Sequence, residues 1–203
     1  MLIKLYPDNP NKKDLLKIVD ILNKDGVIIF PTDSVYAIGC SLNSQKAMNK
    51  IAKLKGIRAD KAKFSIICDS LSNIAKYAKV SNSLFKMMKR NLPGSFTFIL
   101  PGTNELPKLF SSKRKSIGIR IPDHYIPIEI AEELGFPLVT TSLKENDDII
   151  EYLTDPELIY EKYMNQVDVV VDGGYGNNTA STIVECSEDE YEIIRQGKAE
   201  LEE

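Results

Sequence analysis

Hydroxyl and carboxylate side chains directly follow an apolar segment near the start of the chain. The stretch VIIFPTDSVY begins apolar, stops at a proline and then presents Thr32, Asp33, Ser34 and Tyr36. Ligands of open α/β sheets bind beyond the carboxyl ends of strands, so these groups could bind a small polar ligand. Tyr36 could line one side of the site with its ring and offer its hydroxyl to the ligand. The alternative is a turn in which the side chains satisfy their own backbone.

A run of cations forms the second candidate site. Lys55, Arg58, Lys61 and Lys63 lie in KGIRADKAKF, directly before an apolar segment. Arginine grips a phosphate or carboxylate with two parallel hydrogen bonds, and lysine supplies mobile positive charge, so the run could bind an anion. The alternative is a solvated surface, which is the usual role of such charge runs.

The segment SIGIRIPDH combines a core strand with polar groups. Strand alternation places Ser116, Gly118 and Arg120 on one face, and three isoleucines on the other. A glycine between a hydroxyl and a guanidinium would let a ligand approach the backbone closely. We therefore favour a ligand site over an edge strand with one surface salt bridge.

Two further apolar segments end in polar groups. PLVTTS ends in Thr140, Thr141 and Ser142, and EIIRQG carries Arg195. Each segment alone is more typical of a strand end whose polar groups are hydrogen bonded within the protein. Together the segments repeat one pattern, a strand followed by a hydroxyl or guanidinium. The sequence has neither a GxxxxGK[ST] loop nor a GxGxxG turn, and its only histidine, His124, has no obvious partner for triad or metal chemistry. A covalent nucleophile is not expected.

Composition limits the class of protein. The 203 residues suit one domain, and the formal net charge of -3 indicates no general attraction to nucleic acid, although a local basic patch would be compatible with it. Cys40, Cys68 and Cys186 lie far apart without metal or redox spacing, which predicts reduced core thiols. No secretory signal or membrane-span pattern is visible, so we expect a cytoplasmic protein without a membrane partner.

Hydrophobic periodicity predicts alternating helices and strands. Gly26 is expected to cap the first helix, and Ser44 and Gly56 are expected to begin and end the second. Helices are predicted over 13–24, 45–55, 71–78, 82–90, 126–134 and 156–163, and strands over 27–30, 64–68, 96–100, 116–121, 137–141, 167–171, 182–185 and 191–195. This order favours an α/β domain with a mixed, twisted sheet.

These motifs resemble those of a known family. PTDSVYAIGC is similar to the PTDTVYGLGC signature of the YrdC-like family, which comprises threonylcarbamoyl-adenylate synthases and YciO-type proteins. The segments KGIRADKAKFSIIC, PGSFTFIL, SIGIRIPDH, PLVTTS, ASTIVE and IIRQG follow in the family's order. The resemblance implies a single YrdC-like domain over residues 12–200, with a twisted open mixed sheet, flanking helices and a large, positively charged concave cavity.

The resemblance also implies an activity. Synthases of the family form threonylcarbamoyl-adenylate from L-threonine, bicarbonate and ATP, with Mg²⁺, and supply the downstream tRNA threonylcarbamoyl transferase machinery. By the same resemblance, Ser34, Tyr36 and Ser142 bind threonine, Lys55 and Arg58 are catalytic, and the nucleotide contacts Arg58, Lys61, Ser116, Arg120, Thr140, Ser142, Ser181 and Arg195. Such chemistry needs positioned reactants and cations rather than a protein nucleophile.

Several positions depart from the family pattern. Leu143 and Lys144 replace the last residues of STSAN, Ser95 replaces a proline, Ala37 a glycine and Ala59 a proline, and two residues rather than one separate Lys55 from Arg58. These changes resemble the YciO-type branch. The alternative function is therefore a module that binds double-stranded RNA or tRNA with weak or no synthase activity. Such binding should fall steeply with salt and tolerate changes of sequence.

Overall fold

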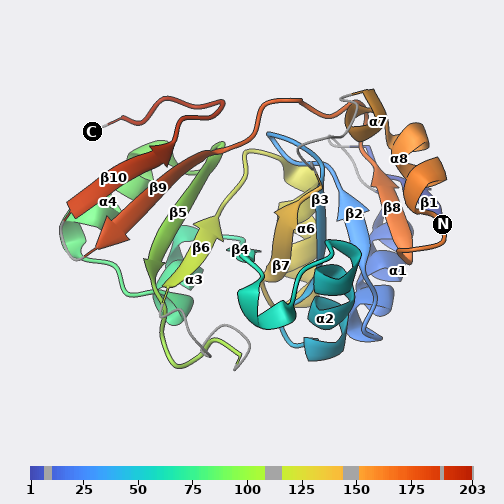
Figure 1. Cartoon of the computed structure of the whole chain (residues 1–203), viewed down its shortest axis with the longest axis horizontal. Helices are drawn as coiled ribbons and strands as arrows, with labels where there is room; N and C mark the ends of the chain where they lie inside the picture. Colours follow the sequence, from blue (N-terminus) through green and yellow to red (C-terminus); the bar gives the residue numbers. More distant parts are fainter. Residues whose placement is uncertain (7–10, 108–115, 144–150, 188–189, 203) are drawn as a thin grey trace.

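The described part of the chain forms one mixed sheet flanked by helices. The computed structural model describes residues 1–6, 11–107, 116–143, 151–187 and 190–202. In these residues ten strands pair in the order β1-β8-β2-β3-β7-β4-β6-β5-β9-β10 (Figure 1). The pairs β1–β8, β8–β2, β4–β6 and β5–β9 are parallel and the others antiparallel. The expected mixed α/β fold is thus confirmed.

Most elements lie where the periodicity predicts them. The strands are β1 (Leu2–Lys4), β2 (Ile28–Phe30), β3 (Ala37–Ser41), β4 (Ser65–Ile67), β5 (Phe96–Pro101), β6 (Ser116–Arg120), β7 (Leu138–Ser142), β8 (Val169–Asp172), β9 (Thr182–Ser187) and β10 (Glu190–Arg195). The helices are α1 (Lys12–Asn23), α2 (Gln45–Leu54), the 3-10 turn η1 (Ala59–Lys61), α3 (Leu71–Tyr77), α4 (Asn82–Asn91), α6 (Tyr125–Leu134), α7 (Glu151–Thr154) and α8 (Pro156–Tyr163).

Several short elements and one helix end differ from the prediction. The strands β1 and β3, the short helix α7 and the 3-10 turn η1 are not among the predicted elements. β3 is buried at every position, so the alternation that marks a half-exposed strand is missing from its sequence. At the end of α1 the left-handed residue is Asp25 (φ 62°), and the Gly26 amide donates to the Ile21 carbonyl. Gly26 therefore follows the left-handed position instead of occupying it, and it is needed because a Cβ there would collide with Ile21.

The sheet has two differently covered faces, which we call the site face and the opposite face. The opposite face carries Ile117 and Ile119 and packs against α2, α3, α4 and α8 in one apolar cluster. The site face carries Gly118 and Arg120. Over β1, β8 and β2 it is covered by α1 and α6. Figure 1 shows α4 behind β9 and β10, so the site face of these strands is turned toward the viewer. Among the described residues, no helix contributes to a core cluster on this part of the site face.

The three cysteines are free and buried, as predicted. Burial raises the pKa of Cys40 and of Cys68 to about 12 and that of Cys186 to about 11, so each thiol stays protonated and shielded. We expect no thiol of the native protein to react with a thiol-specific disulfide reagent at about pH 8, and all of them to react after unfolding. A native thiol that titrates rapidly would contradict this placement.

No helix in the described ranges is long and apolar enough to cross a membrane.

Candidate active site

The loop after β2 forms a turn and also sends polar groups toward the sheet. Thr32 Oγ1 donates to the Val35 carbonyl at 2.7 Å and accepts from the Ser34 amide at 3.1 Å. Thr32 therefore satisfies its own backbone, as the turn interpretation of this stretch predicts. The side chains of Asp33 and Ser34 instead reach Arg120 on β6, and their contact with a ligand stays a prediction.

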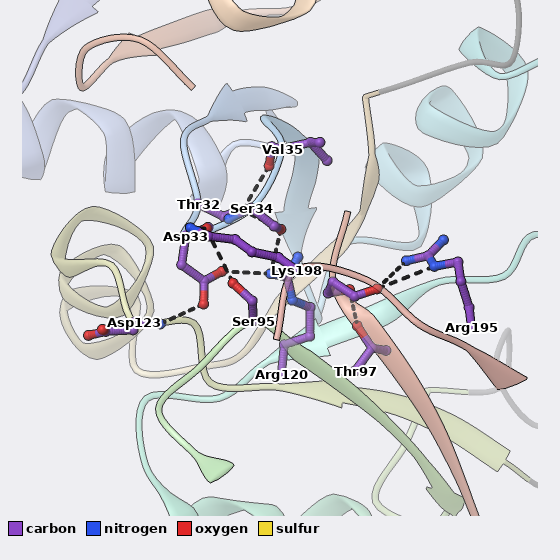
Figure 2. A network of polar contacts seen from close by, with 11 residues as sticks. Thr32, Asp33, Ser34, Val35, Ser95, Thr97, Arg120, Asp123, Arg195 and Lys198 are labelled. Atoms are coloured by element: carbon purple, nitrogen blue, oxygen red, sulfur yellow. Dashed lines mark hydrogen bonds and ion pairs between the residues drawn. The ribbon is translucent and has the colours of Figure 1, made fainter. Parts of the chain in front are cut away.

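A buried ion pair lies at the centre of this site. Arg120 Nη2 donates to Asp33 Oδ1 at 2.9 Å and to Ser34 Oγ at 3.0 Å (Figure 2). The second carboxylate oxygen of Asp33 accepts from the Asp123 amide at 3.0 Å. The Arg120 and Asp33 side chains are only 8% and 6% exposed. The contact joins the 32–34 loop to β6 across 87 positions of the chain.

The Nε–H group of Arg120 is a buried donor without a partner among the described residues. Burial lowers the pKa of Arg120, the Asp33 carboxylate opposes this effect, and the positive charge of Arg195 adds to it. Because arginine keeps its proton in proteins, the site contains a fixed cation with an unsatisfied N–H group. A ligand oxygen could satisfy that group.

A β-bulge directs Arg195 to the same site. Ile193 pairs with Val184, but Arg195 pairs with Ile183, so the register shifts between them. The shift places Arg195 on the site face, whereas regular alternation would leave it with Ile193 on the opposite face. Its Nε and Nη2 donate to the Ser181 carbonyl at 3.2 and 2.7 Å.

Ser181 links Arg195 to the strand beside Arg120. Its Oγ lies 2.9 Å from Thr97 Oγ1 in a buried contact, and Thr97 lies on β5, the strand next to β6. Figure 2 shows Thr97 next to Arg120, and Arg195 on the same side of the network. The structure therefore brings together four of the predicted site residues, Ser34, Arg120, Ser181 and Arg195.

A second group of predicted residues lies at the end of β7. Ser142 pairs with Ala37 in the sheet, and the Leu143 amide donates to the Tyr36 carbonyl. Lys55 reaches this end from α2, with its Nζ 3.4 Å from the Leu143 carbonyl. Lys55 and Ser142 are thus next to the segment that carries Ser34. Lys144 lies outside the described residues.

Tyr36 is used inside the protein. It is fully buried, and its hydroxyl donates to the Gly174 carbonyl at 2.7 Å. Burial raises the pKa of this phenol, so it remains protonated. Tyr36 holds the 173–176 turn against the site loop, and its contact with threonine stays a prediction.

Arg58 and Lys61 lie at the surface in and before η1. Arg58 forms a two-bond ion pair with Asp60, in which both distances are 3.0 Å, and its side chain is 74% exposed. Lys61 is exposed as well. The contacts of neither residue join it to Arg120. Their roles toward a triphosphate therefore stay predictions.

Thr140 and Ser116 lie apart from the centre. Thr140 is buried, and its hydroxyl donates to the Ile38 carbonyl at 3.3 Å. Ser116 is exposed at the other end of β6 from Arg120, about 13 Å away along an extended strand. There it lines a groove of about 430 Å³ with Glu185 and Glu192.

The space above Gly118 is filled by the protein. A Cβ at Gly118 would lie 3.1 Å from Ser65 Cβ and 3.2 Å from Thr97 Cγ2. The glycine therefore permits close packing of β4, β6 and β5, and the prediction that it lets a ligand approach the backbone is not needed to explain it. The predicted alternation is confirmed, because Gly118 and Arg120 share the face opposite the isoleucines.

Sequence reasoning assigned no site role to three residues of this network, Ser95, Thr97 and Lys198. Ser95 Oγ donates to the Asp33 carbonyl at 3.2 Å, and Lys198 Nζ donates to the same carbonyl at 2.6 Å. Asp33 was predicted to bind a small polar ligand, and the structure pairs its carboxylate with Arg120. Ser95, Thr97 and Lys198 could not have been found, because no local pattern distinguishes them from surface or strand residues.

The described residues contain no group of three or more His, Cys, Asp or Glu side chains placed to hold a metal ion. A carboxylate cage for Mg²⁺ is therefore not formed by this part of the chain.

Comparison with known proteins identifies the family. A family model for Sua5, YciO and YrdC proteins, described as telomere recombination, matches residues 20–197. The chain belongs to the Sua5/YciO/YrdC family. It is 37% identical over 199 residues to YciO of Escherichia coli K12, covering 97% of this chain and 95% of the relative. The crystal structure of E. coli YciO superposes with a TM-score of 0.90 over 98% of this chain and 97% of that one.

Two other members of the family extend the comparison. A threonylcarbamoyl-AMP synthase of Enterobacter sp. strain 638 is 30% identical over 129 residues, which cover 61% of this chain and 66% of that protein. Sua5 of P. abyssi, crystallised with L-threonine, superposes with a TM-score of 0.86 at 22% identity, over 97% of this chain and 57% of that chain. The latter shows a shared fold. The predicted YrdC-like membership is thus confirmed.

Proposed function

We propose that this member of the Sua5/YciO/YrdC family forms threonylcarbamoyl-adenylate from L-threonine, bicarbonate and ATP. The observation that carries the proposal is the convergence of Ser34, Arg120, Ser181 and Arg195 on the uncovered part of the site face. Hydroxyls and guanidinium groups bind carboxylates and phosphates, and the arrangement has no nucleophile paired with a general base. Such a site acts by positioning its substrates.

We propose that L-threonine binds at the buried ion pair of Arg120 and Asp33. Arg120 Nε is an unpartnered donor beside the Ser34 hydroxyl, and a bound carboxylate would satisfy it. The resemblance assigned Arg120 to the nucleotide; its burial and its hydrogen bond to Ser34, a predicted threonine contact, favour the amino-acid end instead. The L-threonine complex of P. abyssi Sua5 supports an amino-acid ligand for the fold.

We propose that ATP binds across the strands whose site face is uncovered. Arg195 and the cations at Lys55 and Arg58 supply positive charge for the phosphates, and the Glu185 and Glu192 carboxylates beside Ser116 are suited to ribose hydroxyls. We expect Mg²⁺ to arrive with the triphosphate, because Mg²⁺ is commonly held by substrate phosphates and one or two carboxylates.

The proposed chemistry needs two bond-forming steps. The threonine amine attacks the carbon of bicarbonate, and loss of water leaves a carbamate. A carbamate oxygen then attacks the α-phosphorus of ATP, and the bond to pyrophosphate breaks. Alignment of the reactants can supply about 7–11 kcal/mol of the barrier. Arg195 and the other cations stabilise the charge that develops on the leaving pyrophosphate.

The decisive experiment measures pyrophosphate and threonylcarbamoyl-adenylate from ATP, Mg²⁺, bicarbonate and labelled threonine. We expect threonine-dependent release of both by the wild type. Ser34→Ala removes a hydroxyl that is hydrogen bonded to a charged group, so kcat/KM for threonine should fall about tenfold to a hundredfold. Lys17→Met, on the exposed side of α1, is the matched control and should leave the rate unchanged.

Two outcomes would contradict the proposal. Pyrophosphate release that does not depend on threonine would indicate a different reaction. Salt-sensitive binding of double-stranded RNA or tRNA without product formation would favour the binding module implied by the YciO-type departures. Product that accumulates and is consumed by tRNA threonylcarbamoyl transferase machinery would extend the proposal to tRNA modification.

A further inference from the structure

Lys198 connects two distant parts of the polar network around Arg120, Asp33 and Ser34. It follows β10, and its backbone is fixed, since the Lys198 amide donates to the Ala180 carbonyl at 2.9 Å and the Gly197 amide donates to Thr182 Oγ1 at 3.0 Å. From this fixed point its Nζ reaches the Asp33 carbonyl at 2.6 Å, across 165 positions of the chain (Figure 2). One side chain therefore joins the start of β9 to the loop after β2.

The Asp33 carbonyl is held from two sides. Ser95 Oγ donates to it at 3.2 Å, and the Lys198 ammonium provides the shorter, charged hydrogen bond. The next carbonyl, that of Ser34, accepts from the Asn177 amide at 3.1 Å. These bonds fix the backbone from which the Asp33 carboxylate and the Ser34 hydroxyl extend toward Arg120. A shift of this backbone would move both side chains together.

Lys198 also adds positive charge, and no carboxylate in the described part of the chain forms an ion pair with it. Arg120, Arg195 and Lys198 surround the centre, and of these only Arg120 forms an ion pair with a described carboxylate, that of Asp33. Arg195 and Lys198 both donate to neutral carbonyls. An ammonium has three donors, and the Asp33 carbonyl takes one, so the remaining donors can meet an anionic ligand.

We infer that Lys198 is a positioning residue for the amino-acid substrate. It fixes the Asp33 carbonyl, and through that backbone it sets the places of the Ser34 hydroxyl and the Asp33 carboxylate that orients Arg120. Loss of the ammonium should lower the affinity for the amino acid more than the affinity for ATP. This inference rests on the proposed function, but the fixing of the loop can be measured without any substrate.

The test compares substitutions of Lys198 in the full chain by calorimetric titration with L-threonine and, separately, with ATP and Mg²⁺. Lys198→Met keeps the aliphatic stem and removes the charge, and Lys198→Arg keeps both charge and donors. We expect Lys198→Met to weaken threonine binding about tenfold, which corresponds to about 1.4 kcal/mol, and Lys198→Arg to retain most of the affinity. ATP binding should change less than about twofold in both variants, and Lys17→Met should behave as the wild type.

Hydrogen exchange supplies the second readout. The amides of Ser34 and Asn177 are hydrogen bonded within the held loop, so both should exchange faster in Lys198→Met without ligand. Unchanged threonine binding and unchanged exchange would overturn the inference while leaving the proposed function intact. If the wild type binds no threonine, the proposed function fails. In that case the role toward the amino acid fails as well, and the exchange rates test only the fixing of the loop: faster exchange supports it, and equal exchange overturns it.

Discussion

Replacing Asp33 by alanine is expected to lower the free energy of unfolding by about 3–5 kcal/mol, because it leaves the guanidinium of Arg120 buried without a counter-charge. The Arg120 side chain is only 8% exposed, so water cannot solvate it in place of the carboxylate. Ser34 would remain its one described hydrogen-bond partner. Urea unfolding measures the change, read as a shift of the midpoint at constant slope.

The exposed ion pair of Arg58 and Asp60 provides the matched control. It has the same residue types and two hydrogen bonds, but the Arg58 side chain is 74% exposed. Asp60→Ala should therefore change the unfolding free energy by less than about 1 kcal/mol. A double substitution, Asp33→Leu with Arg120→Met, should be less destabilising than the sum of its single variants, because it removes both charges together. Equal losses for Asp33→Ala and Asp60→Ala would show that the central pair is solvated.

The elements and the family were predictable because they depend on local patterns. The helical spacing of Leu15, Ile18, Val19 and Leu22 gives α1 its buried side, and Ser44 caps α2 through the Ala47 amide as expected. The alternation in β6 correctly separates Arg120 from the isoleucines. Such features need only a few neighbouring residues, so a single sequence contains them.

The geometry of the site was only partly predictable because it depends on pairing between distant segments. Arg195 reaches the site face through a bulge in β10, and no local signal in EYEIIR marks that register shift. Lys198 acts through a carbonyl, so its role follows from the fold and not from residue type. Of the predicted site residues, Ser34, Arg120, Ser181 and Arg195 lie together, whereas Thr140 bonds to the Ile38 carbonyl and Ser116 lies at the opposite end of β6.

Replacing Gly197 by alanine is expected to reduce both stability and activity. A Cβ at this position would lie within 3.0 Å of the Ala180 and Ser181 backbone, which cannot rotate away as a side chain would. The segment must therefore shift, at a cost of about 1–3 kcal/mol in the free energy of unfolding. Because Gly197 stands between Arg195 and Lys198, the shift also displaces both cations. A displacement of about 1 Å can reduce the rate about a hundredfold.

Gly135→Ala is the matched control for this effect. Gly135 has a φ of 74° at the end of α6, and a Cβ there would meet open space, so the substitution strains the backbone without touching the site. It should cost about 1–2 kcal/mol in stability while the folded protein keeps its threonine-dependent rate. In Gly197→Ala the Lys198 amide should also exchange faster, because its bond to the Ala180 carbonyl is displaced. If both variants lost stability and kept full activity, the end of β10 would not position Arg195 and Lys198 for catalysis, and the two cations would have to be replaced by others in the proposed reaction.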